Sequence, residues 1–377
     1  MVPEMQEPYS TLLEGIKFLI LNFKAMLYLD KKILLQLCAV MAMFSLFSCK
    51  PNPETFAIHT PIYPGSGENV TFSLKKIDGN VENVKLYETV QTINASGAVT
   101  ATSATVLLQE WNNPGFPIQF VKSGGYASNR IVNYRFEVYG NDKHYTHDIK
   151  FATRPYPVSN QPAPVYIVGD INNVLNLVFI PDTDMNINTF YNAVKVDIDE
   201  VFHGEDYIRR FRNSYNFFIN PFTGHAHDYD TETRDHEIPS NWDQLSFAQG
   251  KVILHNRDIR DFAEPDKLLF SAEHYVKGTL LHESGHNFYR LADEYGGGVH
   301  WQESELPNNW SSLSACQSAA AGRGMSSADA HQMGTSGWYK LCPASCVMES
   351  SGTAMHPYER PCRDRILYSI LHRAGGE

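Results

Sequence analysis

Two histidines four residues apart, with a glutamate directly after the first, form the clearest chemical pattern in the sequence. The residues are His282, Glu283 and His286. On a helix, residues i and i+4 lie on one face, so both imidazoles can reach one metal ion. Neutral imidazole binds Zn²⁺ at about 2.0–2.1 Å, and Glu283 can take a proton from the water that the ion activates. The pattern predicts one catalytic zinc ion, with Glu283 as the catalytic residue of a hydrolase.

A catalytic zinc site needs a third protein ligand and keeps its fourth position for water. Four acidic residues follow His286 at suitable distances: Asp293, Glu294, Glu303 and Glu305. We predict Asp293, because a short carboxylate near a tight turn can reach the ion more easily than the longer Glu294. Glu294 remains the main alternative, and a thermolysin-like arrangement would use Glu303 or Glu305.

Strands and helices must position this group of residues. Apolar residues at helical spacing predict an active-site helix over about 271–291 and another helix over 187–202. Short apolar runs predict three strands, of which 251–255 is a candidate rim that pairs with an extended peptide. The three predicted strands are Asn176–Pro181, Asn216–Asn220 and Lys251–His255.

The chain before residue 154 has a different sequence pattern. Residues 56–153 consist of β-type runs separated by turn residues, such as the alternating run from Ile131 to Tyr139. This pattern predicts an all-β sandwich without a catalytic group of its own. A proline-rich linker over 154–164 is predicted to lead into an α/β (α+β) domain over 165–377.

The run His282–Tyr295, HESGHNFYRLADEY, resembles the signature of the IgA-peptidase family of zinc metallopeptidases. Downstream, Ser345–Ser350 resembles the Met-turn of metzincins, in which a methionine, here Met348, packs beneath the metal site. The resemblance implies a zincin/metzincin-like metallopeptidase domain that hydrolyses peptide bonds in proteins. The signature residues present are His282, Glu283, Gly285, His286, Leu291, Asp293, Glu294 and Tyr295.

The chain departs from the metzincin pattern at two positions. Metzincins have a glycine three residues after the second histidine and the third ligand six residues after it. These positions hold Tyr289 and Ala292 here. Alanine has no ligand atom, so Asp293 can serve only if the turn absorbs one extra residue.

Some other polar side chains could also line a cleft. Tyr295 and Tyr358 are candidates for stabilising a developing oxyanion. A histidine-rich loop with His225, His227 and His236 is either a solvated loop, a cleft-lining loop or a second cation site.

The N-terminal segment resembles an export signal. Lys31 and Lys32 precede an apolar run that ends in Leu-Phe-Ser-Cys49, similar to the lipobox of bacterial lipoproteins. We therefore expect residues 1–48 to be a signal peptide, with Met26 as an alternative start. Cys49 would carry lipid, residues 49–55 would form a tether, and the protein would be anchored to the bacterial cell envelope.

Four further cysteines lie near the C-terminus. In an exported chain they predict at least one disulfide, with Cys346 beside the Met-turn as one partner. The candidates are Cys316, Cys342, Cys346 and Cys362.

Composition narrows the classes of partner. The 377 residues carry 31 Lys and Arg against 42 Asp and Glu, a net charge of −11. This excess of acidic residues argues against nucleic acid as a binding partner, because phosphate binding needs clustered basic residues. The expected partners are a protein or peptide substrate and, through the lipid, a membrane. The alternative function is a non-catalytic surface lipoprotein that binds glycan or protein through its β-domain.

Overall fold

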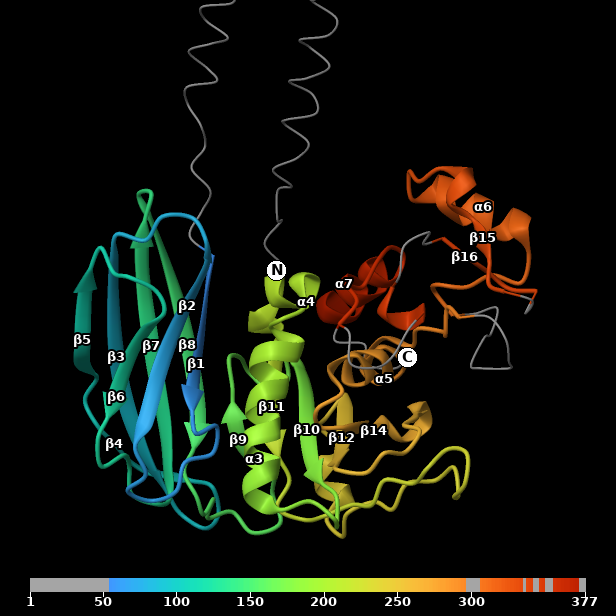
Figure 1. The fold of residues 1–377 in the computed structure, drawn as a ribbon. Helices are drawn as coiled ribbons and strands as arrows, with labels where there is room; N and C mark the ends of the chain where they lie inside the picture. Colours follow the sequence, from blue (N-terminus) through green and yellow to red (C-terminus); the bar gives the residue numbers. More distant parts are fainter. Residues whose placement is uncertain (1–53, 296–305, 335–336, 342–345, 350–354, 373–377) are drawn as a thin grey trace, which may run out of the picture. The chain divides into compact units, whose positions relative to one another are not determined.

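The structure is a computed structural model that describes residues 54–295, 306–334, 337–341, 346–349 and 355–372. This part of the chain is mainly β, arranged in several sheets with few helices (Figure 1). The predicted fold class is confirmed in this coarse form. The predicted signal segment 1–48 and Cys49 lie outside the described residues. Among the described residues, no helix combines the length and apolarity needed to cross a bilayer.

The N-terminal part consists of two antiparallel sheets. Their strand orders are β1-β2-β6 and β4-β3-β7-β8, and β5 also pairs with β3. Strand β7 alternates buried and more exposed residues, as its sequence pattern predicts for a half-buried strand. The strands are β1 (Glu54–Thr60), β2 (Val70–Asp78), β3 (Asn83–Ile93), β4 (Val99–Thr102), β5 (Val106–Asn112), β6 (Ile118–Lys122), β7 (Arg130–Gly140) and β8 (Lys143–Ala152).

Aromatic side chains from the two sheets meet in a shared core. The ring of Phe72 on β2 lies 4.8 Å from Tyr134 on β7 and 6.4 Å from Phe151 on β8. His59 on β1 stacks on Phe151 with 4.0 Å between ring centroids. The inner faces of the two sheets therefore pack against each other.

A six-stranded sheet follows, with the order β13-β14-β12-β10-β11-β9. Strands β10, β11, β12 and β14 are parallel, whereas β9 and β13 at the two ends are antiparallel to their neighbours. Strand β9 begins inside the segment predicted as a linker. The strands are β9 (Ala163–Tyr166), β10 (Leu175–Pro181), β11 (Tyr215–Ile219), β12 (Gly250–His255), β13 (Ala263–Glu264) and β14 (Leu269–Glu273).

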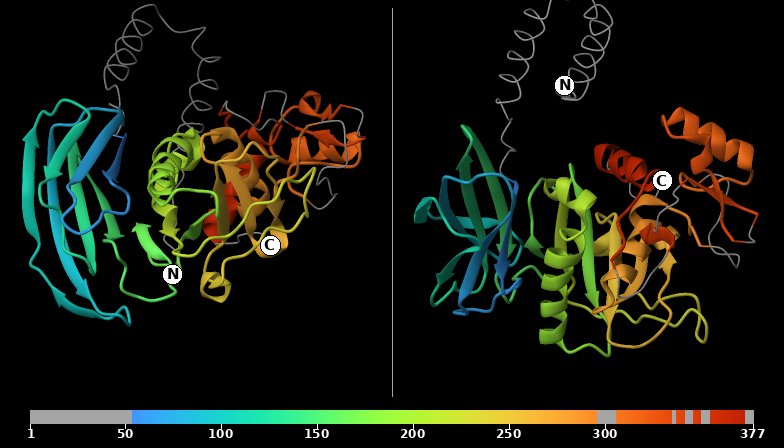
Figure 2. Two further views of the ribbon diagram at one scale, coloured as in Figure 1. Left: turned by 60° about the horizontal axis from the view of Figure 1, so that its bottom comes forward. Right: turned by 45° about the horizontal axis from the view of Figure 1, so that its top comes forward.

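Both faces of this sheet are covered, so its parallel strands are buried throughout. Alternate residues, such as Phe179 and Val252, join the main core with the helices α3 (Ile187–Val196) and α5 (Lys277–Tyr289). The residues between them, such as Val178 and Ile253, pack on the other face in a smaller cluster with Leu245. Figure 2 shows the helices beside the sheet in two further views.

The helices differ from the predicted ranges in two places. The predicted helix 187–202 is α-helical only as α3 (Ile187–Val196) and continues as the π-helical turn η2 (Asp197–Phe202). The predicted active-site helix begins later, because Leu269–Glu273 extends as β14. The remaining α-helices are α4 (Asp206–Arg210), α5 (Lys277–Tyr289), α6 (Leu313–Gly322) and α7 (Cys362–His372), and β15 (His331–Gln332) pairs with β16 (Tyr339–Lys340).

The predicted rim strand 251–255 is wrong. It forms β12, which lies between β10 and β14 and has both of its edges occupied. The terminal strand on this side of the sheet is instead β13, which pairs with β14 among the described residues. An apolar run such as Val252–Leu254 is typical of a strand buried on both faces, which is why it could not serve as an edge.

Candidate metal centre

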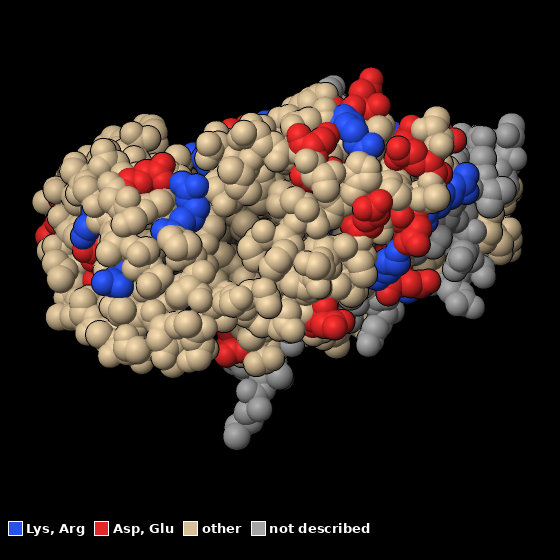
Figure 3. All heavy atoms as spheres, turned by 90° about the horizontal axis from the view of Figure 1, so that it is seen from below, with Lys and Arg blue, Asp and Glu red and all other residues tan. Residues whose placement is uncertain are grey.

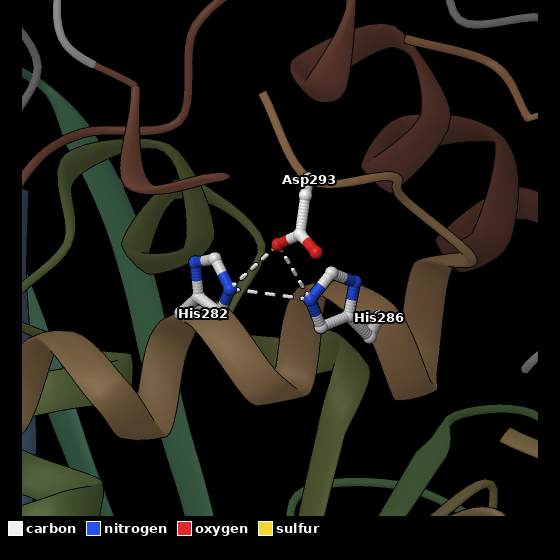
Figure 4. Close-up of side chains that lie close together, drawn as sticks. All are labelled: His282, His286 and Asp293. Carbon is white, nitrogen blue, oxygen red and sulfur yellow. Dashed lines mark hydrogen bonds and ion pairs between the residues drawn. The ribbon is translucent and has the colours of Figure 1, made fainter. Parts of the chain in front are cut away.

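Helix α5 carries His282 and His286 on one face, and the chain that follows the helix brings Asp293 back to them (Figure 4). The Nε2 atoms of the two histidines lie 3.2 Å apart. The Oδ1 atom of Asp293 lies 3.1 Å from Nε2 of His282 and 3.2 Å from Nε2 of His286. Two nitrogen atoms and one oxygen atom thus form a nearly equilateral triangle.

The spacing of these three atoms suits three ligands around one metal ion. Ligands about 2.0–2.1 Å from a tetrahedral zinc ion lie roughly 3.3 Å from one another. Oδ1 of Asp293 is buried without a hydrogen-bond partner among the described residues. Burial raises the pKa of Asp293, but positive charge on His286 and His282, present when no metal ion is bound, outweighs this and holds the pKa below its usual range. The donor set therefore fits a divalent cation.

Backbone carbonyl groups orient both imidazoles. Nδ1 of His282 lies 2.9 Å from the carbonyl oxygen of Val347, and Nδ1 of His286 lies 2.7 Å from that of Leu291. A carbonyl can only accept, so each Nδ1 donates its proton and each Nε2 keeps its lone pair for a metal ion. The backbone thus selects the ligating tautomer of each histidine.

Arg290 makes the turn that returns the chain to the histidines. Helix α5 ends at Tyr289, and Arg290 has the left-handed conformation, with φ 49° and ψ 47°. The amide of Leu291 then bonds to the carbonyl of Gly285 at 3.1 Å. The turn lies one residue beyond the position where metzincins have glycine, and Asp293 lies one residue beyond their third ligand.

The predicted Met-turn residue, Met348, is completely buried in the short helix η7 (Val347–Glu349). Its carbonyl accepts a hydrogen bond of 2.8 Å from the amide of Glu294, next to Asp293. The preceding residue, Val347, is the one whose carbonyl orients His282. This segment therefore supports two of the three candidate ligands through its backbone.

An open cleft of about 570 Å³ borders the three candidate ligands. Glu283 lines it and is only 6% exposed. Burial raises the pKa of Glu283 to about 8, which makes it a better proton acceptor than an exposed glutamate. The segment after β12 and Tyr229 also line the cleft. On the face seen in Figure 3, Asp and Glu side chains gather at one side.

The other predicted residues have different surroundings. Glu294 is buried, and its Oε1 accepts a hydrogen bond of 2.9 Å from Asn308. Tyr295 lines the cleft and stacks at 6.1 Å from His282. The Tyr358 hydroxyl donates to the carbonyl of Leu281 at 2.5 Å, so Tyr358 supports α5 and is wrong as an oxyanion candidate. Glu303 and Glu305 lie outside the described residues.

The histidine-rich loop is held by hydrogen bonds within itself and to neighbouring segments. His225 pairs with Asp182 at 3.0 Å, and His227 bonds to Thr233 at 2.6 Å. Buried His236 lies 3.2 Å from the carbonyl of Phe262. The described residues group none of these three histidines into a metal site.

Three of the four predicted disulfide cysteines are described, and all three are buried free thiols. Cys346 and Cys362 lie close together, with 3.8 Å between their sulfur atoms. Cys316 is in α6, where its Sγ lies 3.4 Å from the carbonyl oxygen of Lys340. Cys342 lies outside the described residues.

Sequence reasoning missed Asn308, which shapes the loop that carries Asp293. Its side chain accepts from the amide of Ala292 at 2.7 Å and donates to the carbonyl of the same residue at 2.8 Å. It also donates to Glu294. Asn308 is 16 residues beyond Ala292, and no sequence motif marks it. A buried amide that satisfies both backbone groups of one residue is visible only in the folded chain.

Comparison with known proteins adds little to this geometry. No protein-family model matches the chain, and no curated protein matches it. Among solved structures, the sporulation control protein Spo0M of Bacillus subtilis is similar at a TM-score of 0.19 and 11% identity, over 29% of this chain and 53% of that one. A Paenibacillus cycloisomaltooligosaccharide glucanotransferase, complexed with cycloisomaltoheptaose, is similar at a TM-score of 0.20 and 12% identity, over 54% of this chain and 28% of that one.

The chain therefore spans about half of the first of these structures and less than a third of the second. Neither similarity carries an argument about fold or function at these TM-scores.

Proposed function

We propose that the protein is a zinc-dependent endopeptidase of the IgA-peptidase type, with a metzincin-like catalytic domain after an accessory β-sandwich. One observation carries the proposal: His282, His286 and Asp293 converge within 3.1–3.2 Å at the border of an open cleft that Glu283 also lines. A purely structural metal site needs ligands but no base and no cleft. The presence of both favours catalysis.

The ligands and the base have separate tasks in the proposed reaction. His282, His286 and Asp293 would hold the zinc ion, which would supply a Lewis acid and lower the pKa of water to about 7. Glu283 accepts a proton from the attacking water and later delivers it to the leaving amine. Because Glu283 is buried, few waters compete for this proton.

The wall of the cleft suits an extended peptide. Ala263 of β13 lines the cleft, and β13 is the terminal strand of its sheet. An extended segment of a protein substrate can pair with such an edge through main-chain hydrogen bonds, whatever its side chains. This supports a peptide substrate and an endopeptidase, because an open groove accepts a chain on both sides of the metal.

Replacing Glu283 by Gln tests the proposal directly. The variant keeps the shape of the side chain and all three ligands, so it should retain zinc and lose about 10²–10⁴ in the rate of cleavage of a denatured protein. Glu273→Gln is the matched control, because Glu273 is another buried acid that lines the same cleft. It should stay within a few-fold of the parent rate.

The same experiment separates the proposal from its alternative. Full activity in zinc-loaded Glu283→Gln would exclude Glu283 as the base. If the parent chain holds zinc but cleaves nothing, a non-catalytic surface protein that binds glycan or protein becomes the better interpretation. Terminal-amine profiling of a mixed proteome with the parent and the variant would then identify the substrate class.

We also propose that lipid on Cys49 anchors the enzyme at the bacterial cell envelope. The Leu-Phe-Ser-Cys sequence after an apolar run supports this, and two or more acyl chains suffice for stable attachment. Retention of Cys49→Ser in the membrane fraction would contradict it.

A further inference from the structure

A second group of side chains that can bind a metal ion includes the residue that directly follows Asp293 in the sequence. A carboxylate oxygen of Glu294 and the sulfur atoms of Cys346 and Cys362 all lie within 4.8 Å of one another. They come from three separate segments: the loop after α5, the residue before η7 and the first residue of α7. All three side chains are buried.

The spacing of the two sulfur atoms fits a shared metal ion. Thiolates bind zinc at about 2.3 Å, so two of them in a tetrahedral site lie roughly 3.8 Å apart. The sulfur atoms of Cys346 and Cys362 are 3.8 Å apart, joined by a thiol hydrogen bond and not by a disulfide. Oε1 of Glu294 lies 3.2 Å from the sulfur of Cys362, a few tenths of an ångström less than the roughly 3.6 Å of such a site.

The carboxylate of Glu294 gives an independent sign of a missing partner. Its Oε1 accepts from Asn308 and from the Cys362 thiol, but its Oε2 is buried without a hydrogen-bond partner among the described residues. An unpaired buried polar atom is costly, and more so when it belongs to a charged group. A cation bound by this carboxylate would offset the cost of burying its charge.

We propose that Glu294, Cys346 and Cys362 bind a second zinc ion, with a structural role. Two thiolates and a carboxylate are ligand types that zinc accepts. The two thiols release their protons to solvent when the ion binds. The proposal does not depend on catalysis at the first site.

Such an ion would fix the support of the first site. Glu294 follows Asp293 directly, and Cys346 precedes Val347, whose carbonyl orients His282. Cys362 adds the start of α7, from which Arg365 donates to the carbonyl of Tyr289 at 2.8 Å, at the end of α5. One ion would thus hold three segments that surround the catalytic helix.

The metal content of the whole chain, purified without reductant, tests the proposal. The background is the double variant His282→Ala/His286→Ala, which removes the first site and leaves the second intact. We expect about two zinc ions per parent chain and about one in the double variant. Adding Cys362→Ser should remove the remaining zinc, whereas adding Cys316→Ser should not, because Cys316 is a buried cysteine outside the group.

Cobalt in place of zinc provides a readout that does not depend on the folding of the Cys362 variant. The double variant loaded with Co²⁺ should show sulfur-to-cobalt charge-transfer absorption, which requires thiolate ligands. A folded double variant without metal, or a Cys346–Cys362 disulfide found by mass spectrometry, would overturn the proposal. Because the first site is absent from this background, failure here would leave the proposed peptidase function untouched.

Discussion

The sulfur of Met348 occupies the space that a side chain at Gly285 would need. A Cβ atom on Gly285 would lie 2.3 Å from Sδ of Met348 and 3.1 Å from its Cε. Gly285 is on α5 between the two candidate histidine ligands. The glycine of the His-Glu-Ser-Gly-His motif therefore allows η7 to pack closely against the active-site helix.

We expect Gly285→Ala to destabilise the protein by about 1–3 kcal/mol, the usual cost of overpacking a tight core. Zinc affinity should fall as well, because displacing Met348 also moves Val347 and its hydrogen bond to His282. Urea unfolding and a chelator titration measure the two effects. Gly322→Ala is the control: Gly322 is also in a helix, but a Cβ there meets nothing within 4 Å. A Gly285→Ala variant as stable as this control would refute the tight packing.

The second prediction concerns the backbone conformation of Arg290. A residue other than glycine in the left-handed region costs about 1 kcal/mol or more, and Arg290 has φ 49° there. Arg290→Gly and Arg290→Ala both remove the side chain, so their comparison isolates the backbone. The Gly variant should be more stable than the Ala variant by about 1 kcal/mol in urea unfolding. Equal stability would mean that the turn can relax to an ordinary conformation.

These two positions show what the sequence could and could not predict about the site. The spacing of His282 and His286 places both on one helical face, whatever the rest of the fold. The sequence also indicated that the turn needed one extra residue before Asp293, but Tyr289 and Arg290 carry no signal that says where. The turn is held partly by a residue far away in the sequence, because Arg365 donates to the carbonyl of Tyr289.

The same limit applies to the sheet and to the group of Glu294 and two cysteines. Parallel strands buried on both faces read as short apolar runs, so β12 was recognisable as a strand but not as a central one. Strand β13 has two residues and no pattern at all. Glu294 and Cys362 are 68 residues apart, and only the folded chain brings them together.

Asp293 should be the third ligand of the first site. Asp293→Ala should lower the zinc affinity of that site by more than about 10²-fold, because removing a residue that only supports a ligand already costs about 10–100-fold. Residual peptidase activity followed in chelator titrations reports the first site alone. Asp258→Ala is the matched control, an exposed acid that lines the same cleft. Equal affinity of the two variants would move the assignment to another acid.

Asp182 should make stability depend on pH below neutrality. Burial raises the pKa of Asp182, but hydrogen bonds from the Ala226 amide at 2.6 Å and from His225 at 3.0 Å outweigh it, so the folded pKa lies below its usual value. A carboxyl group whose pKa is lower in the folded state stabilises the protein above its unfolded pKa of about 3.9. This contribution disappears as the pH falls through the folded value.

The matched variant is Asp182→Asn, which keeps the shape and removes the charge. Near pH 7 it should be less stable than the parent by about 1–3 kcal/mol, since hydrogen bonds to a charged group are lost. The gap should shrink as the pH is lowered towards about 3, where the parent aspartate becomes protonated. Urea unfolding of both proteins across this range measures the gap. A gap that stays constant with pH would mean that Asp182 contributes through its shape alone, and that its charge adds nothing to the loop holding His225.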